Sequence, residues 1–153
     1  MPNRTEHKVV GLGAGFVYAG CRGSSQPIAY QFTEAVGGAI GGYLGGSLPD
    51  VFEPAYSSWH RDFMHSWSIG ASIVGIASKI EWWEQHCRQR ASHYHTLRTM
   101  SNNDPLTSFC YFLIELFWRL AAGFINGLFA GYVSHQALDA CTPRGLPIFA
   151  RLG

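Results

Sequence analysis

Apolar residues run along this chain in long stretches whose spacing fits helices better than strands. The pattern predicts four helical segments, at residues 5–21, 30–46, 61 or 62 to 97, and 106–141. Thr5 is a candidate N-cap for the first of them. No stretch shows the convincing alternation of apolar and polar residues that marks a half-buried strand. We therefore expect an all-α fold, a compact bundle of about four to five helices in a single domain covering residues 1–153.

The connections between these helices carry their own signals. Pro49 and Pro54 predict a loop over residues 48–59, and the sequence SNNDP at 101–105 predicts a break followed by a helix start. The most polar part of the chain, residues 81–100, is expected to form a polar helical arm. Its neighbouring Trp82 and Trp83 suit a partner surface or a membrane interface, or they pack on the bundle.

Glycine is abundant, at 18 residues, and it lies inside apolar runs such as VVGLGAG and AVGGAIGGYLGG. Small residues three or four apart let helix backbones approach closely, in membrane bundles and in tightly packed soluble ones. The longest charge-free stretches, 35–49 and 120–134, fall short of the about 20 residues that a membrane span needs. Mean hydropathy is only +0.02. The pattern leaves both environments open and slightly favours a soluble or peripheral protein.

Composition narrows the function classes. Charged residues make up 14% of the chain and the net charge is +1, so no bulk field attracts nucleic acid or anionic lipid. Arg88, Arg90 and Arg98 are nearly balanced by Glu81 and Glu84, which argues against a nucleic-acid partner. The four cysteines form no C-x-x-C pair, which argues against a zinc ribbon or a thioredoxin-like site. We expect reduced cysteines in an intracellular protein without a cleavable signal peptide.

Two groups of residues can bind metal. Asp50 follows the second helix directly, and His60 and His65 lie where the next helix begins, so their side chains can approach one ion from different sides. His135 and Asp139 are four residues apart and share one helical face, which makes a two-point clamp for zinc, manganese or iron. The competing explanation is a set of core histidines satisfied by hydrogen bonds. Histidines 86, 93 and 95 of the polar arm are a weaker alternative.

The order of these residues resembles the YdjM family. The motifs that carry the resemblance are a histidine near the N-terminus, GGSLPD, HRDFMHS, a Gly-rich apolar helix, and GYVSHQALDACTPRGLPI, which together cover nearly the whole chain. Members are described as metal-dependent hydrolases, often associated with the inner membrane. The family is distantly similar to zinc-dependent phospholipase C and related zinc nucleases, which are all-α enzymes.

The resemblance implies a metal site and a set of roles. The metal ligands it assigns are His7, Asp50, His60, His65, His135 and Asp139. The cofactor would be a divalent metal, zinc or alternatively manganese or iron, as one ion or more. Beyond the resemblance, we expect Glu53 or Asp62 as the general base, with Glu53 alternatively a further ligand or a loop surface residue. Arg61 would hold a phosphate or orient a ligand carboxylate, and Ser66 or Ser134 would fix histidine tautomers. The chain departs from the family pattern at residues 51 and 62, where Val51 replaces an acidic residue and Asp62 adds one.

Two functions follow from this reading. The first is a metal-dependent hydrolase that uses metal-activated water on a phosphoester, either a small molecule of the nucleotide class or a lipid. The second is a non-catalytic protein in which metal joins the helices, with a homo-oligomer or a membrane surface as partner. The resemblance implies a bacterial or phage-derived protein, cytoplasmic or associated with the inner membrane.

Overall fold

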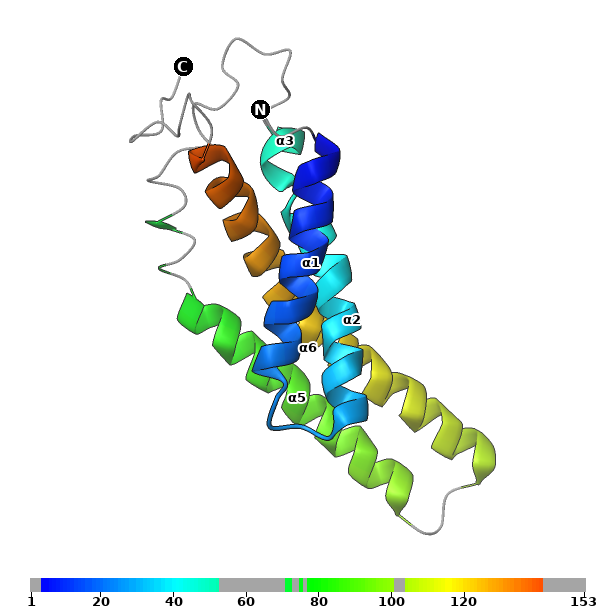
Figure 1. Cartoon of the computed structure of the whole chain (residues 1–153). Helices are drawn as coiled ribbons and strands as arrows, with labels where there is room; N and C mark the ends of the chain where they lie inside the picture. Colours follow the sequence, from blue (N-terminus) through cyan, green and yellow to red (C-terminus); the bar gives the residue numbers. More distant parts are fainter. Residues whose placement is uncertain (1–3, 53–70, 73–74, 76, 101–103, 142–153) are drawn as a thin grey trace.

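The computed structural model describes residues 4–52, 71–72, 75, 77–100 and 104–141. The elements in order are α1 (Arg4–Arg22), α2 (Ile28–Gly45), α3 (Leu48–Phe52), α5 (Ala77–Thr99) and α6 (Pro105–Ala140). Within these residues there is no strand, which confirms the all-α prediction. The antiparallel pair α1 and α2 packs on α6, and α5 runs antiparallel to the first half of α6 (Figure 1).

The predicted helices agree with the structure except around residue 48. Three predicted segments begin and end within two residues of α1, α2 and α6, and the polar arm lies in α5. The expected loop over 48–59 instead begins with the short helix α3. Pro49 is compatible with this helix because a proline in the first turn has its φ already near the helical value and needs no N–H acceptor. The rest of that predicted loop, and most of residues 61–76, lie outside the described residues.

Helix α6 begins where the sequence signal places it. Asp104 is the N-cap, and its carboxylate accepts hydrogen bonds from the Thr107 backbone N–H at 2.9 Å and from the Thr107 hydroxyl at 2.8 Å. These bonds, the backbone one first, lower the pKa of Asp104. Pro105 follows in the first turn, where its missing N–H costs nothing.

Glycines form the contact between α1, α2 and α6. A Cβ built on Gly42 of α2 would collide with the backbone of Gly11 and Gly15 in α1, and one on Gly131 of α6 would collide with the backbone of Gly42. The three backbones therefore touch directly, as they do in helix pairs that associate through small residues. The residue at these positions has to be glycine because no side chain fits between the helices.

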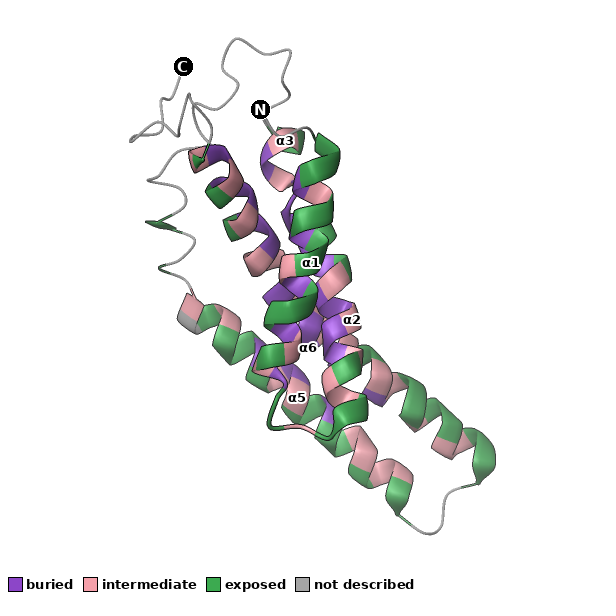
Figure 2. Cartoon of the chain, in the orientation of Figure 1, coloured by how far each residue is buried: buried purple, intermediate pink, exposed green. Residues whose placement is uncertain are grey.

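Burial in this bundle is the reverse of that in a typical soluble protein. The buried apolar residues are mostly small, whereas the buried polar and charged residues include Glu34, Glu84, Glu115 and Arg119. Large apolar side chains of α1, α2 and α6 are exposed, and exposed residues lie along the outer sides of these helices (Figure 2). By length and composition, α6 is the one helix among the described residues that can cross a membrane, and its most apolar window is only 22% buried. A soluble core helix would be mostly buried.

Ion pairs attach the polar helix α5 to the other helices. Glu84 is paired with Arg22 of α1 at 2.6 Å and with Arg88 at 2.7 Å, and Arg88 reaches Glu34 of α2 at 2.6 Å. Both glutamates are fully buried. The charges balance in this network, so burial leaves no carboxylate without a cation. Trp82 and Trp83 of α5 are exposed.

Candidate metal centre

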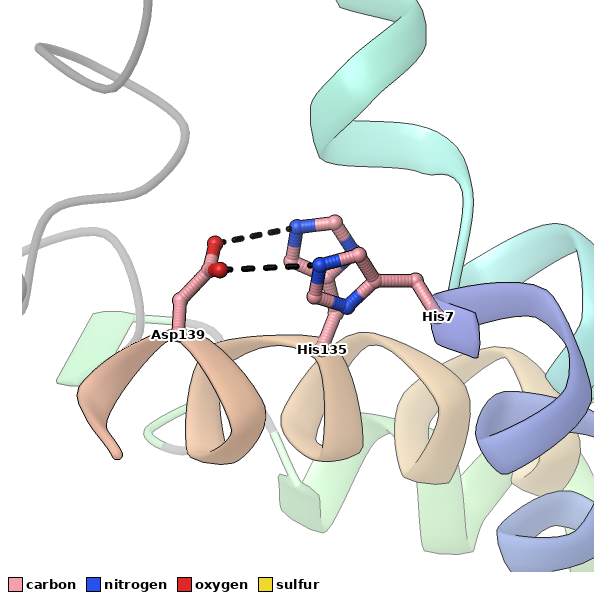
Figure 3. A group of neighbouring side chains, drawn as sticks. All are labelled: His7, His135 and Asp139. Atoms are coloured by element: carbon pink, nitrogen blue, oxygen red, sulfur yellow. Dashed lines mark ion pairs between the residues drawn. The ribbon is translucent and has the colours of Figure 1, made fainter. Parts of the chain in front are cut away.

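Three elements bring four of the predicted ligands together at one end of the bundle. His7 lies in the first turns of α1, Asp50 lies in α3, and His135 and Asp139 lie in the last turns of α6. The i, i+4 spacing puts His135 and Asp139 on the same face of α6, as predicted from the sequence. His7 reaches over from α1 so that its ring stacks on that of His135, with centroids 3.7 Å apart (Figure 3).

The nitrogen and oxygen atoms of this group converge. His7 Nε2 lies 3.5 Å from Asp139 Oδ1, and His135 Nε2 lies 3.3 Å from Asp139 Oδ2. Asp50 Oδ1 is a little farther, at 3.9 Å from His135 Nε2. His7, His135 and Asp139 each offer a ligand atom within 4.8 Å of the others, and in the described part of the chain they form the group suited to a metal ion.

The members of this group differ in how far they are buried. His7, His135 and Asp139 are all buried, whereas Asp50 keeps part of its side chain exposed. Two stacked imidazoles and a carboxylate are costly to bury unless their charges and lone pairs are satisfied. His7 Nδ1 has no hydrogen-bond partner among the described residues.

A backbone carbonyl decides the tautomer of His135. Its Nδ1 lies 2.7 Å from the carbonyl oxygen of Gly46, at the end of α2. A carbonyl oxygen only accepts, so Nδ1 carries the proton and donates it. In the neutral ring Nε2 is then a lone pair, and it faces the carboxylates of Asp139 and Asp50. A lone pair facing a carboxylate repels it, unless a proton or a metal ion lies between them.

The dimensions of the group suit a metal ion. Tetrahedral zinc with ligands at about 2.0–2.1 Å places neighbouring ligand atoms roughly 3.3 Å apart. The two separations between histidine nitrogens and Asp139 oxygens are 3.3 and 3.5 Å. An imidazole whose second nitrogen donates to a backbone carbonyl is also the usual arrangement of a metal-bound histidine. The residues present therefore fit a divalent metal.

Six of the predicted site residues lie outside the described residues: Glu53, His60, Arg61, Asp62, His65 and Ser66. Ser134 is described, and its expected role is wrong, because its hydroxyl donates to the Gly131 carbonyl and Gly46 orients His135 instead. Sequence reasoning missed Gly46 because a backbone carbonyl has no signature in residue type.

The histidines of the polar arm do not join a metal group within the described residues. His95 Nδ1 lies 3.0 Å from the Tyr30 hydroxyl and 3.3 Å from the Glu115 carboxylate. His86 stacks on Trp82 of α5 and contacts Trp118 of α6 edge to face, and His93 is exposed. The weaker metal alternative placed on these three histidines therefore has no support from the described geometry.

Comparison with known proteins bears on the whole chain. No curated protein and no solved structure gives a match. The profile of the YdjM inner membrane protein family matches residues 1–150. That description agrees with the exposed apolar surface, so of the two environments left open by the sequence the inner membrane is favoured. The match includes all four clustered residues and nearly the whole chain, and the chain belongs to the YdjM inner membrane protein family.

Proposed function

We propose that this protein binds a divalent metal of the zinc type through His7, His135 and Asp139, with Asp50 as a further ligand, and hydrolyses a phosphoester. The observation that supports this most is the locked tautomer of His135, whose Nε2 lone pair faces two carboxylates. Two buried, stacked imidazoles cannot both be protonated without repulsion, and a metal ion satisfies both as neutral ligands.

A bound divalent ion would lower the pKa of a water ligand towards neutrality and polarise a phosphoryl oxygen. Residues of the chain orient the ligands and supply negative charge where the metal would bind. The Gly46 carbonyl holds the His135 ring in orientation, and Asp139 presents one carboxylate oxygen to each imidazole. Asp50 is the partly exposed member, so the side of the group next to α3 is where a substrate enters. Glu53 and Asp62 remain proposed bases, and Arg61 the proposed phosphate contact.

A lipid phosphoester suits this position better than a nucleotide. The metal group lies at the end of a bundle whose α1, α2 and α6 expose large apolar side chains. A lipid headgroup at a bilayer boundary would reach such a group directly, while the chains stay among the apolar faces. The preference for phosphoesters itself comes from the distant similarity of the family to zinc phospholipases.

Metal content tests the binding half of the proposal. Full-length protein purified without chelator is expected to hold at least one zinc-type ion per chain by elemental analysis. His135→Ala and Asp139→Ala should each lose most of that metal. His93→Ala removes an exposed imidazole from α5 and is the matched control, with metal content unchanged. Full metal retention in both cluster variants would show that these residues do not share a site.

Hydrolysis is tested separately on the metal-loaded protein. We expect cleavage of a phosphodiester or phospholipid probe that stops after chelation and returns when zinc is added. Asp139→Ala should abolish it, and His93→Ala should leave it intact. Metal-loaded protein that cleaves no member of a broad phosphoester panel would contradict the catalytic half while leaving metal binding in place.

A structural metal is the second candidate. It is favoured by the nearly complete burial of three ligands and by their origin in helices at opposite ends of the chain. A metal there would join α1 to α6 and stabilise the fold by mass action, by about 2.7 kcal/mol at a hundredfold excess over Kd. A large loss of melting temperature on chelation, without any hydrolytic activity, would favour this function.

A further inference from the structure

A polar pocket and an apolar groove adjoin on the outer side of α1 and α6. The pocket has a volume of about 220 Å³, and Arg22, Glu81 and Asn126 contribute its polar groups. The groove has a volume of about 420 Å³ and runs between α1 and α6 past Val17 and Ala130. The two share a pair of lining residues, so they adjoin and form a depression that is polar at one end and apolar along the rest.

Two aromatic rings form the junction. Tyr18 of α1 and Phe129 of α6 line both the pocket and the groove, and their ring centroids are 6.0 Å apart. Beyond them the groove is lined by small or apolar side chains and reaches as far as Ala137. The volume of the groove falls in the range of about 300–1,000 Å³ typical of ligand sites. Its walls suit an alkyl chain.

An unsatisfied amide lies at the back of the pocket. Asn126 is buried, and its Nδ2 donates to the Ala122 carbonyl at 3.2 Å, which fixes the orientation of the amide. Its Oδ1 has no hydrogen-bond partner among the described residues. A buried acceptor without a donor costs free energy, and a ligand that carries N–H or O–H groups removes that cost. The pocket therefore calls for a ligand with a donor.

A charge of each sign lies at the pocket mouth. Arg22 contacts Glu81 at 3.5 Å, and both are partly exposed. Arg22 donates to Glu84 and Glu81 through Nε and Nη2, and within the described residues Nη1 is left for a further acceptor. A cation and an anion side by side complement a zwitterion, with phosphate on Arg22 and an ammonium between Glu81 and Asn126.

We propose that this depression binds one phospholipid with a primary-ammonium, zwitterionic headgroup of the phosphatidylethanolamine type. The headgroup occupies the pocket, and an acyl chain passes over the contact between Tyr18 and Phe129 into the groove. A choline headgroup has no N–H to donate to Asn126, so it binds less well. Val17, at the open side of the groove, is strongly exposed, so the groove opens towards the acyl region of a bilayer.

This lipid site is separate from the proposed hydrolytic site. Asn126 lies nine residues before His135 on α6, which corresponds to about 13 Å along the helix. The lipid phosphate at Arg22 is thus far from His135 and Asp139. The bound lipid would be retained rather than cleaved, and the proposal stands whether or not the metal group is catalytic.

Native mass spectrometry of the full chain in detergent tests the proposal. After delipidation, phosphatidylethanolamine or phosphatidylcholine with identical acyl chains is added back. We expect one retained phosphatidylethanolamine per chain, at several-fold higher occupancy than phosphatidylcholine. Glu81→Gln, an exposed change that leaves the fold intact, should remove the preference between the lipids, and so should Asn126→Leu.

The groove is tested by filling it. Ala130→Phe should abolish retention of both lipids, whereas Ile40→Phe, on an exposed face of α2, should leave retention unchanged. Equal retention in these two variants would overturn the proposal. So would a wild-type chain that retains neither lipid, or Glu81→Gln protein that keeps the full preference.

The labelling rate of Cys21 shows directly whether the groove is occupied, because this thiol is exposed and lines the groove. In protein whose other cysteines are replaced by serine, phosphatidylethanolamine should slow maleimide labelling of Cys21 several-fold. Slow labelling of lipid-free protein at all concentrations would mean that the chain itself fills the groove. Slow labelling only at high protein concentration would mean that a second copy does. Either result would overturn the proposal.

Discussion

His135 shows how much of the site chemistry is decided at the scale of one residue. Its imidazole could in principle serve as a donor or as an acceptor at either nitrogen. The carbonyl oxygen of Gly46, 2.7 Å from Nδ1, removes that choice and directs the Nε2 lone pair at Asp139. An imidazole prepared in this way is ready to bind a metal without reorganisation.

Cys87 gives a prediction at the same scale. Burial raises the pKa of its thiol, and the charge of Glu34 raises it further. Because the thiolate is the reactive form, iodoacetamide should alkylate Cys87 several-fold more slowly at neutral pH than the exposed Cys141. The raised pKa stabilises the fold at low pH, and this contribution is lost as the pH rises through the folded-state pKa.

Mass spectrometry of peptides after timed alkylation measures this difference. The Cys87 rate should rise steeply only at alkaline pH, above the range in which Cys141 already reacts fully. Equal rates for the two cysteines across neutral pH would show that Cys87 is neither buried nor perturbed in solution.

At the scale of whole helices, glycines decide how closely α1, α2 and α6 pack. Gly42→Ala places a methyl group against the backbone of Gly11 and Gly15, so the helices must separate. We expect a loss of about 1–3 kcal/mol in the free energy of unfolding, as in other overpacked cores. Gly13→Ala in α1 meets nothing within 4 Å and should stabilise the helix by up to about 1 kcal/mol.

Melting curves of the two variants in the same detergent provide the measurement. The changes in melting temperature should have opposite signs because one methyl group meets backbone and the other meets open space. If Gly42→Ala melts at or above the wild-type temperature, the close contact between α1 and α2 is not present in solution.

The ion pairs decide whether α5 stays attached. Glu84→Gln removes the carboxylate that Arg22 and Arg88 share, and because Arg22 is partly exposed and Arg88 keeps Glu34, we expect a cost of about 1–3 kcal/mol. Glu81→Gln, three residues away on the same helix, removes an exposed charge and should cost less than about 1 kcal/mol. Hydrogen exchange should therefore accelerate throughout α5 in the first variant and remain near the wild-type rate in the second. Equal protection in both would argue against the network.

For the whole molecule, the apolar surface and the buried charges belong together. Glu115 and Arg119 interrupt the apolar run of α6, yet both are buried and paired with one another at 3.2 Å. A charge that faces protein rather than lipid is far less costly in a membrane. The charged residues that argued against a span in the sequence are therefore compatible with one.

Spin labels test which faces meet lipid. Labels attached at Ile40→Cys of α2 and Phe117→Cys of α6 should be relaxed mainly by oxygen, which concentrates in lipid. A label at Gln89→Cys on the exposed polar side of α5 should instead be relaxed mainly by a water-soluble nickel chelate. The measurement is power-saturation electron paramagnetic resonance in reconstituted vesicles. Higher nickel than oxygen accessibility at positions 40 and 117 would place these faces in water.

Much of the fold could be read from the sequence because its signals are local. Pro105 marks the start of α6, and apolar runs predict three helices within two residues of their ends. The N-cap predicted at Thr5 is wrong, because α1 begins at Arg4 and Thr5 lies inside its first turn. The sequence did not predict α3, because Pro49 and Pro54 together indicate a loop, although a single proline is compatible with the first turn of a helix. The ion pair between Glu84 and Arg22 was not predicted either, because the two residues are far apart in the chain and their residue types do not identify the partner.

The sequence by itself determined the helices, the small-residue contacts and the face shared by His135 and Asp139, because spacing along a helix depends only on neighbouring residues. Tertiary structure alone brought His7 and Asp50 to that face and directed the Gly46 carbonyl at His135. It also decided which side of each helix faces the bundle. Those choices depend on contacts between distant segments. Close glycine contacts and buried ion pairs fill the interior of the bundle, so the large apolar side chains lie on its outside.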